Sequence, residues 1–275
     1  MLLLRWVALL AVLCISIAVV SGVAAALPDG GQLAVVAGGQ IYWVDVLSGR
    51  AMLLTPQGRE FSLAYGPIQW SPDGSKLGFQ VASITHSGVG FIDFPTLQRT
   101  RVAGTFEENA RDFAWSPDSR MIAFIRENRA QAISEIWVLS LDTYSPTLLS
   151  DEAGYRLVWS PDGSMVGYIL LSGDSFRLIS VNTRDIQTVD IDHASEWSNP
   201  NLRLIQANLW DPQVASEMSG GVSLSSDGRR IASICNSDYQ RLSASICVMG
   251  VDGTGLREII RFPAWNMPDE VAWRP

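Results

Sequence analysis

Short apolar runs alternate with turn-forming polar residues along the chain from residue 27 onward. Most runs have strand length (about 4–8 residues) and are rich in Val, Ile, Leu and Phe, as at Leu77–Val81 and Val89–Phe94. Gly, Pro, Asp and Ser separate the runs, as expected of tight turns. This pattern predicts an all-β chain made of many short strands.

One phrase recurs within this pattern. It reads Trp-Ser-Pro-Asp-Gly at Trp70–Gly74 and Trp159–Gly163, and ends in Ser at Trp115–Ser119. A degenerate copy, Leu-Ser-Ser-Asp-Gly, occurs at Leu224–Gly228. Counted from Asp29, the aspartates of the copies are spaced 44, 45, 44 and 65 residues apart. A period of about 40–45 residues is that of a four-stranded propeller blade. The sequence therefore predicts a β-propeller.

Each part of the phrase has a structural explanation. Pro, Asp and Gly suit successive positions of a tight turn, and Ser119 in place of Gly is expected to be mildly strained. The aspartates are interpreted as turn-forming residues rather than metal ligands: Asp73, Asp118, Asp162 and Asp227. Blades pack face to face, so a large flat ring at the same place in each blade can fill the space between neighbours. The tryptophans interpreted in this way are Trp70, Trp115, Trp159 and Trp273.

The two ends of the chain are complementary. The first unit begins at Pro28-Asp29-Gly30 without a preceding Trp strand, and the chain ends in a Trp strand, Glu270–Pro275, with nothing after it. Pairing of the Trp273 strand with Leu33–Val36 would close the ring and remove exposed sheet edges. Residues 27–275 are thus predicted to be one propeller domain, with five blades favoured.

The long step between Asp162 and Asp227 indicates an insertion at about 192–220. If this stretch is a reduced blade, the propeller has six blades. Irregular segments on a rigid scaffold are common binding sites, which makes four residues here candidate binding residues: His193, Trp197, Trp210 and Asp211. The alternative is that the two tryptophans only cap the neighbouring blade.

Residues 1–26 resemble a targeting segment. Arg5 precedes a long apolar stretch, and Val23–Ala26 offers small residues for cleavage, as in a secretory signal peptide. The alternative is an uncleaved anchor, because Trp6–Leu27 is long enough to cross a bilayer. Either reading places the domain outside the cytoplasm: periplasmic, secreted or on the cell surface.

Composition narrows the choice of partner. The chain has 275 residues, a formal net charge of −8 and 17% charged residues, so it is globular and lacks the basic excess that a nucleic-acid backbone would require. Outside the leader, Cys235 and Cys247 lie on neighbouring apolar runs. They either pair as a disulfide in an oxidising compartment or remain two buried thiols.

The Trp-Ser-Pro-Asp-Gly phrase, followed by an apolar strand, resembles the repeats of TolB-like, WD40-like propellers. Similar repeats occur in the propeller domains of prolyl oligopeptidase-type enzymes. The resemblance covers nearly all of residues 27–275 and implies the architecture rather than the activity, because propellers carry many unrelated functions. Members of the TolB type have a separate domain before the propeller, whereas the propeller predicted here starts just after the leader.

No motif supports catalysis. There is no Gly-x-Ser-x-Gly elbow of an α/β-hydrolase, and the two histidines, His86 and His193, form no cluster with ligand spacing. Several acids lie between predicted strands and are interpreted as solvated loop charges: Glu60, Glu107, Glu108, Asp112, Asp151 and Glu152.

We therefore expect a monomeric, non-catalytic scaffold without a cofactor or metal, which binds a protein or a glycan at the cell envelope. The membrane would be a partner only through residues 6–27. The alternative is a propeller-type glycan lyase or hydrolase, or an accessory propeller of a hydrolase system.

Overall fold

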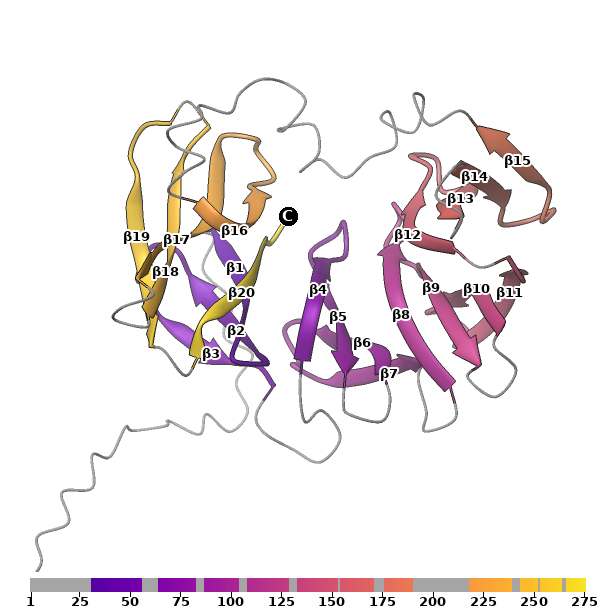
Figure 1. Ribbon diagram of the computed structural model, residues 1–275, viewed down its shortest axis with the longest axis horizontal. Helices are drawn as coiled ribbons and strands as arrows, with labels where there is room; N and C mark the ends of the chain where they lie inside the picture. The colour runs from indigo at the N-terminus through magenta and orange to yellow at the C-terminus, as the bar shows by residue number, and fades with distance from the viewer. Residues whose placement is uncertain are drawn as a thin grey trace, which may run out of the picture.

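The computed structural model describes residues 31–55, 64–82, 87–103, 108–128, 133–152, 154–170, 176–189, 218–238, 243–251, 253–263 and 266–275. In these residues the chain forms five antiparallel sheets of four strands each. The sheets stand around a common centre as the blades of a β-propeller (Figure 1). The all-β propeller predicted from the repeat is therefore confirmed.

The blades are numbered here in chain order. Blade 1 contains β1 (Gln32–Ala37), β2 (Gln40–Asp45), β3 (Ala51–Leu53) and β20 (Pro268–Trp273). Blade 2 contains β4 (Ala64–Trp70), β5 (Lys76–Ala82), β6 (Ser87–Asp93) and β7 (Arg99–Ala103). Blade 3 contains β8 (Glu108–Trp115), β9 (Met121–Asn128), β10 (Ile133–Ser140) and β11 (Ser145–Ser150). Blade 4 contains β12 (Gly154–Trp159), β13 (Met165–Leu170), β14 (Phe176–Ser180) and β15 (Ile186–Val189). Blade 5 contains β16 (Met218–Leu224), β17 (Arg230–Asp238), β18 (Ser243–Gly250) and β19 (Arg257–Pro263).

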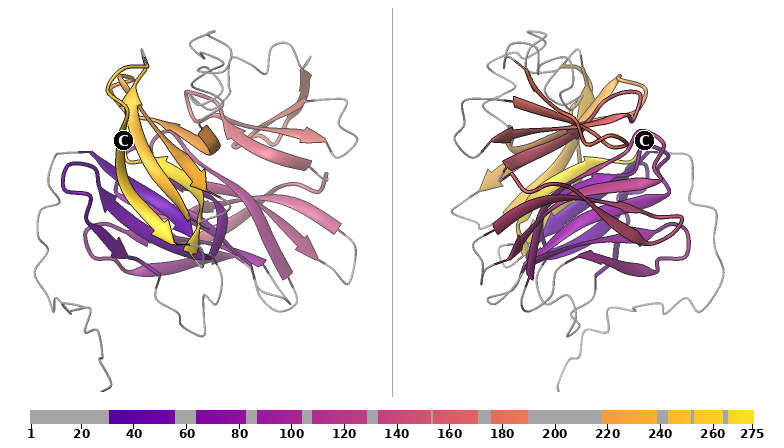
Figure 2. Two further views of the ribbon diagram at one scale, coloured as in Figure 1. Left: turned by 60° about the vertical axis from the view of Figure 1, so that its left-hand side comes forward. Right: turned by 90° about the vertical axis from the view of Figure 1, so that its right-hand side faces the viewer.

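The inner strands are β20, β4, β8, β12 and β16, which face the centre of the ring (Figure 1). Blade 5 packs on blade 1, blade 1 on blade 2, blade 2 on blade 3, and blade 3 on blade 4. The turned views show blades 5 and 1 side by side (Figure 2). Residues 190–217, which join blade 4 to blade 5, lie outside the described residues, and so does most of the predicted insertion at 192–220.

The end of that insertion was predicted too late in the chain. β16 begins at Met218, so the last residues assigned to the insertion belong to a strand. The pairing of β16 with β17 changes register between Met218 and Val222. Ser219, Gly220 and Gly221 interrupt the apolar pattern at this irregularity, which is why the strand start was not visible in the sequence.

Burial of both blade faces explains the continuous apolar runs. All six residues of β1 are buried. Leu33 and Val35 pack in the core shared with blade 5, whereas Ala34 and Val36 pack in the core shared with blade 2. A strand buried on both faces has no polar face, so it reads as a continuous hydrophobic run rather than an alternating one.

The C-terminal strand closes blade 1 as predicted. β20 pairs with β1 in antiparallel register, with Leu33 opposite Trp273 and Val35 opposite Val271. Beyond the strand, the Arg274 backbone N–H donates to the Gln32 carbonyl (2.8 Å). The Arg274 guanidinium donates to the Gly74 carbonyl in blade 2 (2.8 Å). The seam therefore joins the two ends of the chain and the next blade.

The serine of the repeat organises its turn. The Ser160 hydroxyl is buried, donates to Asp162 Oδ1 (2.6 Å) and accepts from the Met165 N–H (2.9 Å). Ser71, Ser116 and Ser225 make the same two bonds in their own turns. The hydrogen bond from Ser160 is the main reason that the pKa of Asp162 is lowered to about 2. These aspartates hold turns, consistent with the interpretation made from the sequence.

Ser119 replaces the turn glycine at a positive φ of 62°, a conformation that costs a non-glycine residue free energy. Its hydroxyl accepts a hydrogen bond from the Asp73 N–H in blade 2 (3.0 Å). Glycine could not make this bond between blades, which offsets the strain expected from the sequence.

Within the part of the chain that the structure describes, no helix is long and apolar enough to cross a bilayer. The leader, residues 1–26, lies outside that part.

Candidate functional site

The four candidate binding residues of the insertion, His193, Trp197, Trp210 and Asp211, lie outside the described residues and remain predictions. The described candidate region is the wall formed by the inner strands, since these strands surround the centre of the ring (Figure 1).

The inner strands carry pairing irregularities a few residues before the Trp position. The register shifts between Tyr65 and Ile68 in β4, between Arg111 and Phe113 in β8, and between Tyr155 and Val158 in β12. A shift of this kind leaves backbone groups outside the ladder and can redirect a side chain. The backbone groups left unpaired at each irregularity therefore need hydrogen-bond partners outside the strand ladder.

The neighbouring blade supplies those partners. The Ile68 N–H donates to Glu270 Oε2 of blade 1 (3.0 Å), and the Asp112 N–H donates to Gln80 Oε1 of blade 2 (3.5 Å). The Arg156 N–H donates to Asp112 Oδ2 of blade 3. At three successive interfaces, a side chain of one blade thus accepts a backbone bond from the next blade. The wall of the ring is fixed by these bonds and not by apolar packing alone.

The repeat tryptophans add a second set of bonds between blades. Trp70 Nε1 donates to the Ala272 carbonyl (3.2 Å), Trp115 Nε1 to the Gln69 carbonyl (3.0 Å), and Trp159 Nε1 to the Ala114 carbonyl (3.0 Å). In every case the acceptor residue directly precedes the Trp of the preceding blade. The rings are buried between blades as the repeat suggested, but sequence reasoning missed this bond. The signal for it was the recurrence of tryptophan, an aromatic ring with an N–H donor, at this position of every blade except blade 5, which has Leu224.

Two carboxyl groups on the wall, those of Glu270 and Asp112, have raised pKa values. Burial raises the pKa of Glu270 to about 7, with a smaller contribution from the negative charge of Asp269. Burial likewise raises the pKa of Asp112, although the Arg156 N–H bonded to it acts in the opposite direction. Carboxyl groups with raised pKa values occur often at functional sites, and also in structural networks.

Backbone strain marks the same place. Asp112 has a φ of +50° and Arg156 a φ of +58°, and they are joined by the hydrogen bond between blades 3 and 4. A non-glycine residue in this region costs about 1–3 kcal/mol and is often associated with function. The side chain of Arg156 is exposed, so its guanidinium group is accessible to a ligand.

The interpretation of Asp112 as a solvated loop charge is therefore wrong. Asp112 lies within β8, because the strand extends well before the short apolar segment visible in the sequence. Glu152 does lie between strands, but its Oε2 accepts a hydrogen bond from the buried Tyr168 hydroxyl (2.8 Å). Burial is the main reason that the pKa of Tyr168 is raised to about 12.

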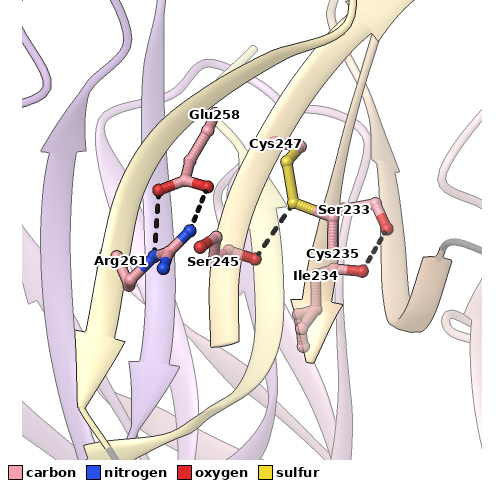
Figure 3. The surroundings of a disulfide bond; sticks show 7 residues. All are labelled: Ser233, Ile234, Cys235, Ser245, Cys247, Glu258 and Arg261. Atoms are coloured by element: carbon pink, nitrogen blue, oxygen red, sulfur yellow. Dashed lines mark hydrogen bonds and ion pairs between the residues drawn. A yellow bond between two sulfur atoms is a disulfide. The ribbon is translucent and has the colours of Figure 1, made fainter. Parts of the chain in front are cut away.

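Cys235 and Cys247 form a disulfide between β17 and β18. Cys235 Sγ also lies 3.5 Å from the Ser245 carbonyl oxygen (Figure 3). Both cysteines are buried, with 3% and 1% exposure. Of the two alternatives left by the sequence, the structure contains the disulfide.

The described residues include no group of three or more His, Cys, Asp or Glu side chains arranged to hold a metal ion. On the wall, the carboxyl groups of Glu270 and Asp112 accept bonds from neighbouring blades. The arrangement can offer Arg156 as a hydrogen-bond donor to an acidic or polar ligand.

No family model matches the chain. The curated "Uncharacterized peptidase YuxL" of Bacillus subtilis (strain 168) is 24% identical over 105 residues, which are 36% of this chain and 16% of that protein.

Among solved structures, the chain is similar to TolB from Acinetobacter baumannii (13% identity, TM-score 0.49, covering 90% of this chain and 68% of that one). It is also similar to a chain of the nidogen/laminin complex (11% identity, TM-score 0.49, covering 90% and 99%) and to an oligogalacturonate lyase in complex with manganese (14% identity, TM-score 0.45, covering 84% and 64%). At 11–14% identity these likenesses say nothing about activity.

Proposed function

We propose that the protein is a non-catalytic, extracytoplasmic propeller that binds a protein or a glycan at the cell envelope. The observation that carries this proposal is the wall of the ring, where Arg156 stands exposed on a strained backbone held by Asp112. Bonds between blades fix that wall, so a ligand would meet preorganised groups at little entropic cost.

One oxygen of each wall carboxyl group, Asp112 Oδ2 and Glu270 Oε2, accepts a backbone N–H of the neighbouring blade. These bonds give both carboxyl groups a structural role, which supports a scaffold function. The buried disulfide supports an oxidising compartment, where such bonds persist.

The proposed partner surface includes the end of the ring where β15 leaves blade 4 and β16 enters blade 5. The chain between these strands, residues 190–217, carries the four candidate binding residues. A loop joining an outer strand to the next inner strand starts and ends at the same end of the ring as the other connections between blades.

Site-specific photo-crosslinking in cells of the source organism tests the proposal. A photo-reactive phenylalanine analogue is placed at Arg156 or at Trp210, and the matched control is Asn182, an exposed residue at the opposite end of blade 4. We expect a discrete adduct with a protein or glycan from Arg156 and Trp210 and none from Asn182. Absence of adducts at both test positions, or equal adducts at all three, would refute binding at this end.

A further inference from the structure

The exposed apolar side chains of the described residues gather at one end of the propeller. This end, called the turn face here, consists of the four Trp-Ser-Pro-Asp-Gly-type turns and the turns between the third and fourth strands of each blade. Backbone bonds join the two kinds of turn, such as Phe94 N–H to the Ser75 carbonyl (2.8 Å) and Val181 N–H to the Ser164 carbonyl (3.0 Å). All large hydrophobic residues that are exposed in the described ranges lie in these turns or within a few residues after them: Leu47, Met52, Leu53, Leu97, Tyr144, Ile186 and Leu256.

Two of these side chains are held at an energetic cost. Leu97 has a φ of +58° and Tyr144 a φ of +52°, each four residues after the end of its third strand. Glycine occupies the corresponding position in blade 1, at Gly49, with a φ of +68°. A left-handed conformation costs a non-glycine residue free energy, yet Leu97 is 39% and Tyr144 57% exposed. Packing within the fold therefore does not account for an apolar residue at either position.

The N-terminal segment enters the fold at this same face. Gly31, the first described residue, accepts a hydrogen bond from the Val46 N–H (3.1 Å), next to the exposed Leu47. Only Pro28, Asp29 and Gly30 separate Gly31 from the apolar stretch Trp6–Leu27. A fully extended chain over that interval spans at most about 14 Å. If Trp6–Leu27 stays in a bilayer, the part of the turn face around Gly31 is held within about 14 Å of the end of that segment.

We propose that the turn face rests on the surface of a lipid bilayer in which Trp6–Leu27 is retained. Leu47, Leu97, Tyr144 and Leu256 enter the interfacial layer, where aliphatic side chains gain from burial and tyrosine is favoured. The proposal goes beyond the proposed function, because it holds whatever the opposite end of the ring binds. It also leaves that end directed away from the membrane.

The turn face carries both arginines and ionised aspartates, so a neutral lipid surface suits it better than an anionic one. Arg50, Arg184 and Arg229 are exposed in the turns of this face. The repeat aspartates are tied into their own turns, as Asp162 is by Ser160 and Ser164. A neutral lipid surface is therefore an adequate partner, and an anionic surface is not required.

Depth-dependent fluorescence quenching tests the proposal on the full chain. Cys14 is changed to Ser, the disulfide is left intact, and an environment-sensitive fluorophore is attached to Tyr144→Cys. The matched control is Asp151→Cys, because Asp151 is also exposed and lies at the other end of β11, about 20 Å away along the strand. The protein is reconstituted into phosphatidylcholine vesicles with and without headgroup spin-labelled phosphatidylcholine.

We expect the label at residue 144 to be blue-shifted and quenched by the spin-labelled lipid at least several-fold more strongly than the label at residue 151. Equal quenching at both positions, or none at either, would overturn the proposal. So would a mass spectrum of the cell-derived protein showing cleavage before Leu27. Contact between two copies of the chain would shift the fluorescence without lipid-dependent quenching, and that result also contradicts membrane docking.

Discussion

Neutralising Glu270 should make the protein more stable at alkaline pH. The carboxyl group lies on β20 at the seam, and burial raises its pKa from the ordinary 4.5 to about 7. The folded state therefore holds a proton that the unfolded state releases between these two pH values. The stabilisation is fully present below pH 4.5 and is lost as the pH rises through 7.

The size of the effect follows from the pKa. Since one pKa unit corresponds to about 1.4 kcal/mol, ionisation of Glu270 costs the folded state about 3 kcal/mol above pH 7. The Glu270→Gln amide cannot ionise, and its oxygen can still accept from the Ile68 N–H. We expect the variant to match the wild type at pH 4.5 and to exceed it by about 2–3 kcal/mol at pH 8.5.

Urea unfolding at a series of pH values measures this difference. Taking the variant minus the wild type at each pH cancels the contributions of other groups, such as the turn aspartates with lowered pKa values. Glu127→Gln is the control, because Glu127 forms a partly exposed ion pair with Arg111. A Glu270→Gln difference that does not change between pH 4.5 and 8.5 would refute the reasoning.

Three further outcomes are expected. Trp115→Phe should lower the free energy of unfolding by about 1 kcal/mol in urea titrations, because it leaves the partly buried Gln69 carbonyl without its donor; a variant as stable as the wild type would show that the bond adds nothing. Deletion of Asp269–Pro275 should lower the melting temperature sharply, whereas deletion of Pro275 alone should not; an unchanged melting curve for the longer deletion would contradict closure at the seam. Labelling of the denatured, non-reduced domain, residues 27–275, should find no reactive thiol, and reduction should expose Cys235 and Cys247 and cost about 2–4 kcal/mol of stability; two thiols reactive before reduction would exclude the disulfide.

The repeat made most of the fold predictable. A serine, an aspartate and a glycine at fixed spacing define a local turn whose hydrogen bonds stay within a few residues, as between Ser160 and Met165. Local interactions of this kind can be predicted from a single sequence. The start of β16 could not be predicted, because Met218 and the glycines after it show no apolar alternation.

The candidate wall was harder to foresee. Asp112 looked like a loop charge because the polar residues Arg111 and Asp112 interrupt the apolar pattern of its strand before Trp115. Its partner, the Arg156 N–H, is 44 residues away in the next blade. Nothing in the local pattern of either strand signals that contact.

The sequence by itself determined the repeat unit, the four strands of each blade, the turn chemistry and the closure by the Trp273 strand. These features depend on periodicity and on interactions between near neighbours. Only the tertiary structure decided which carboxyl groups are buried on the wall, which N–H groups they accept from, and that the exposed apolar residues share one face. Such properties arise when strands from different blades are brought together, and pairwise contact between distant segments leaves no local pattern in a single chain.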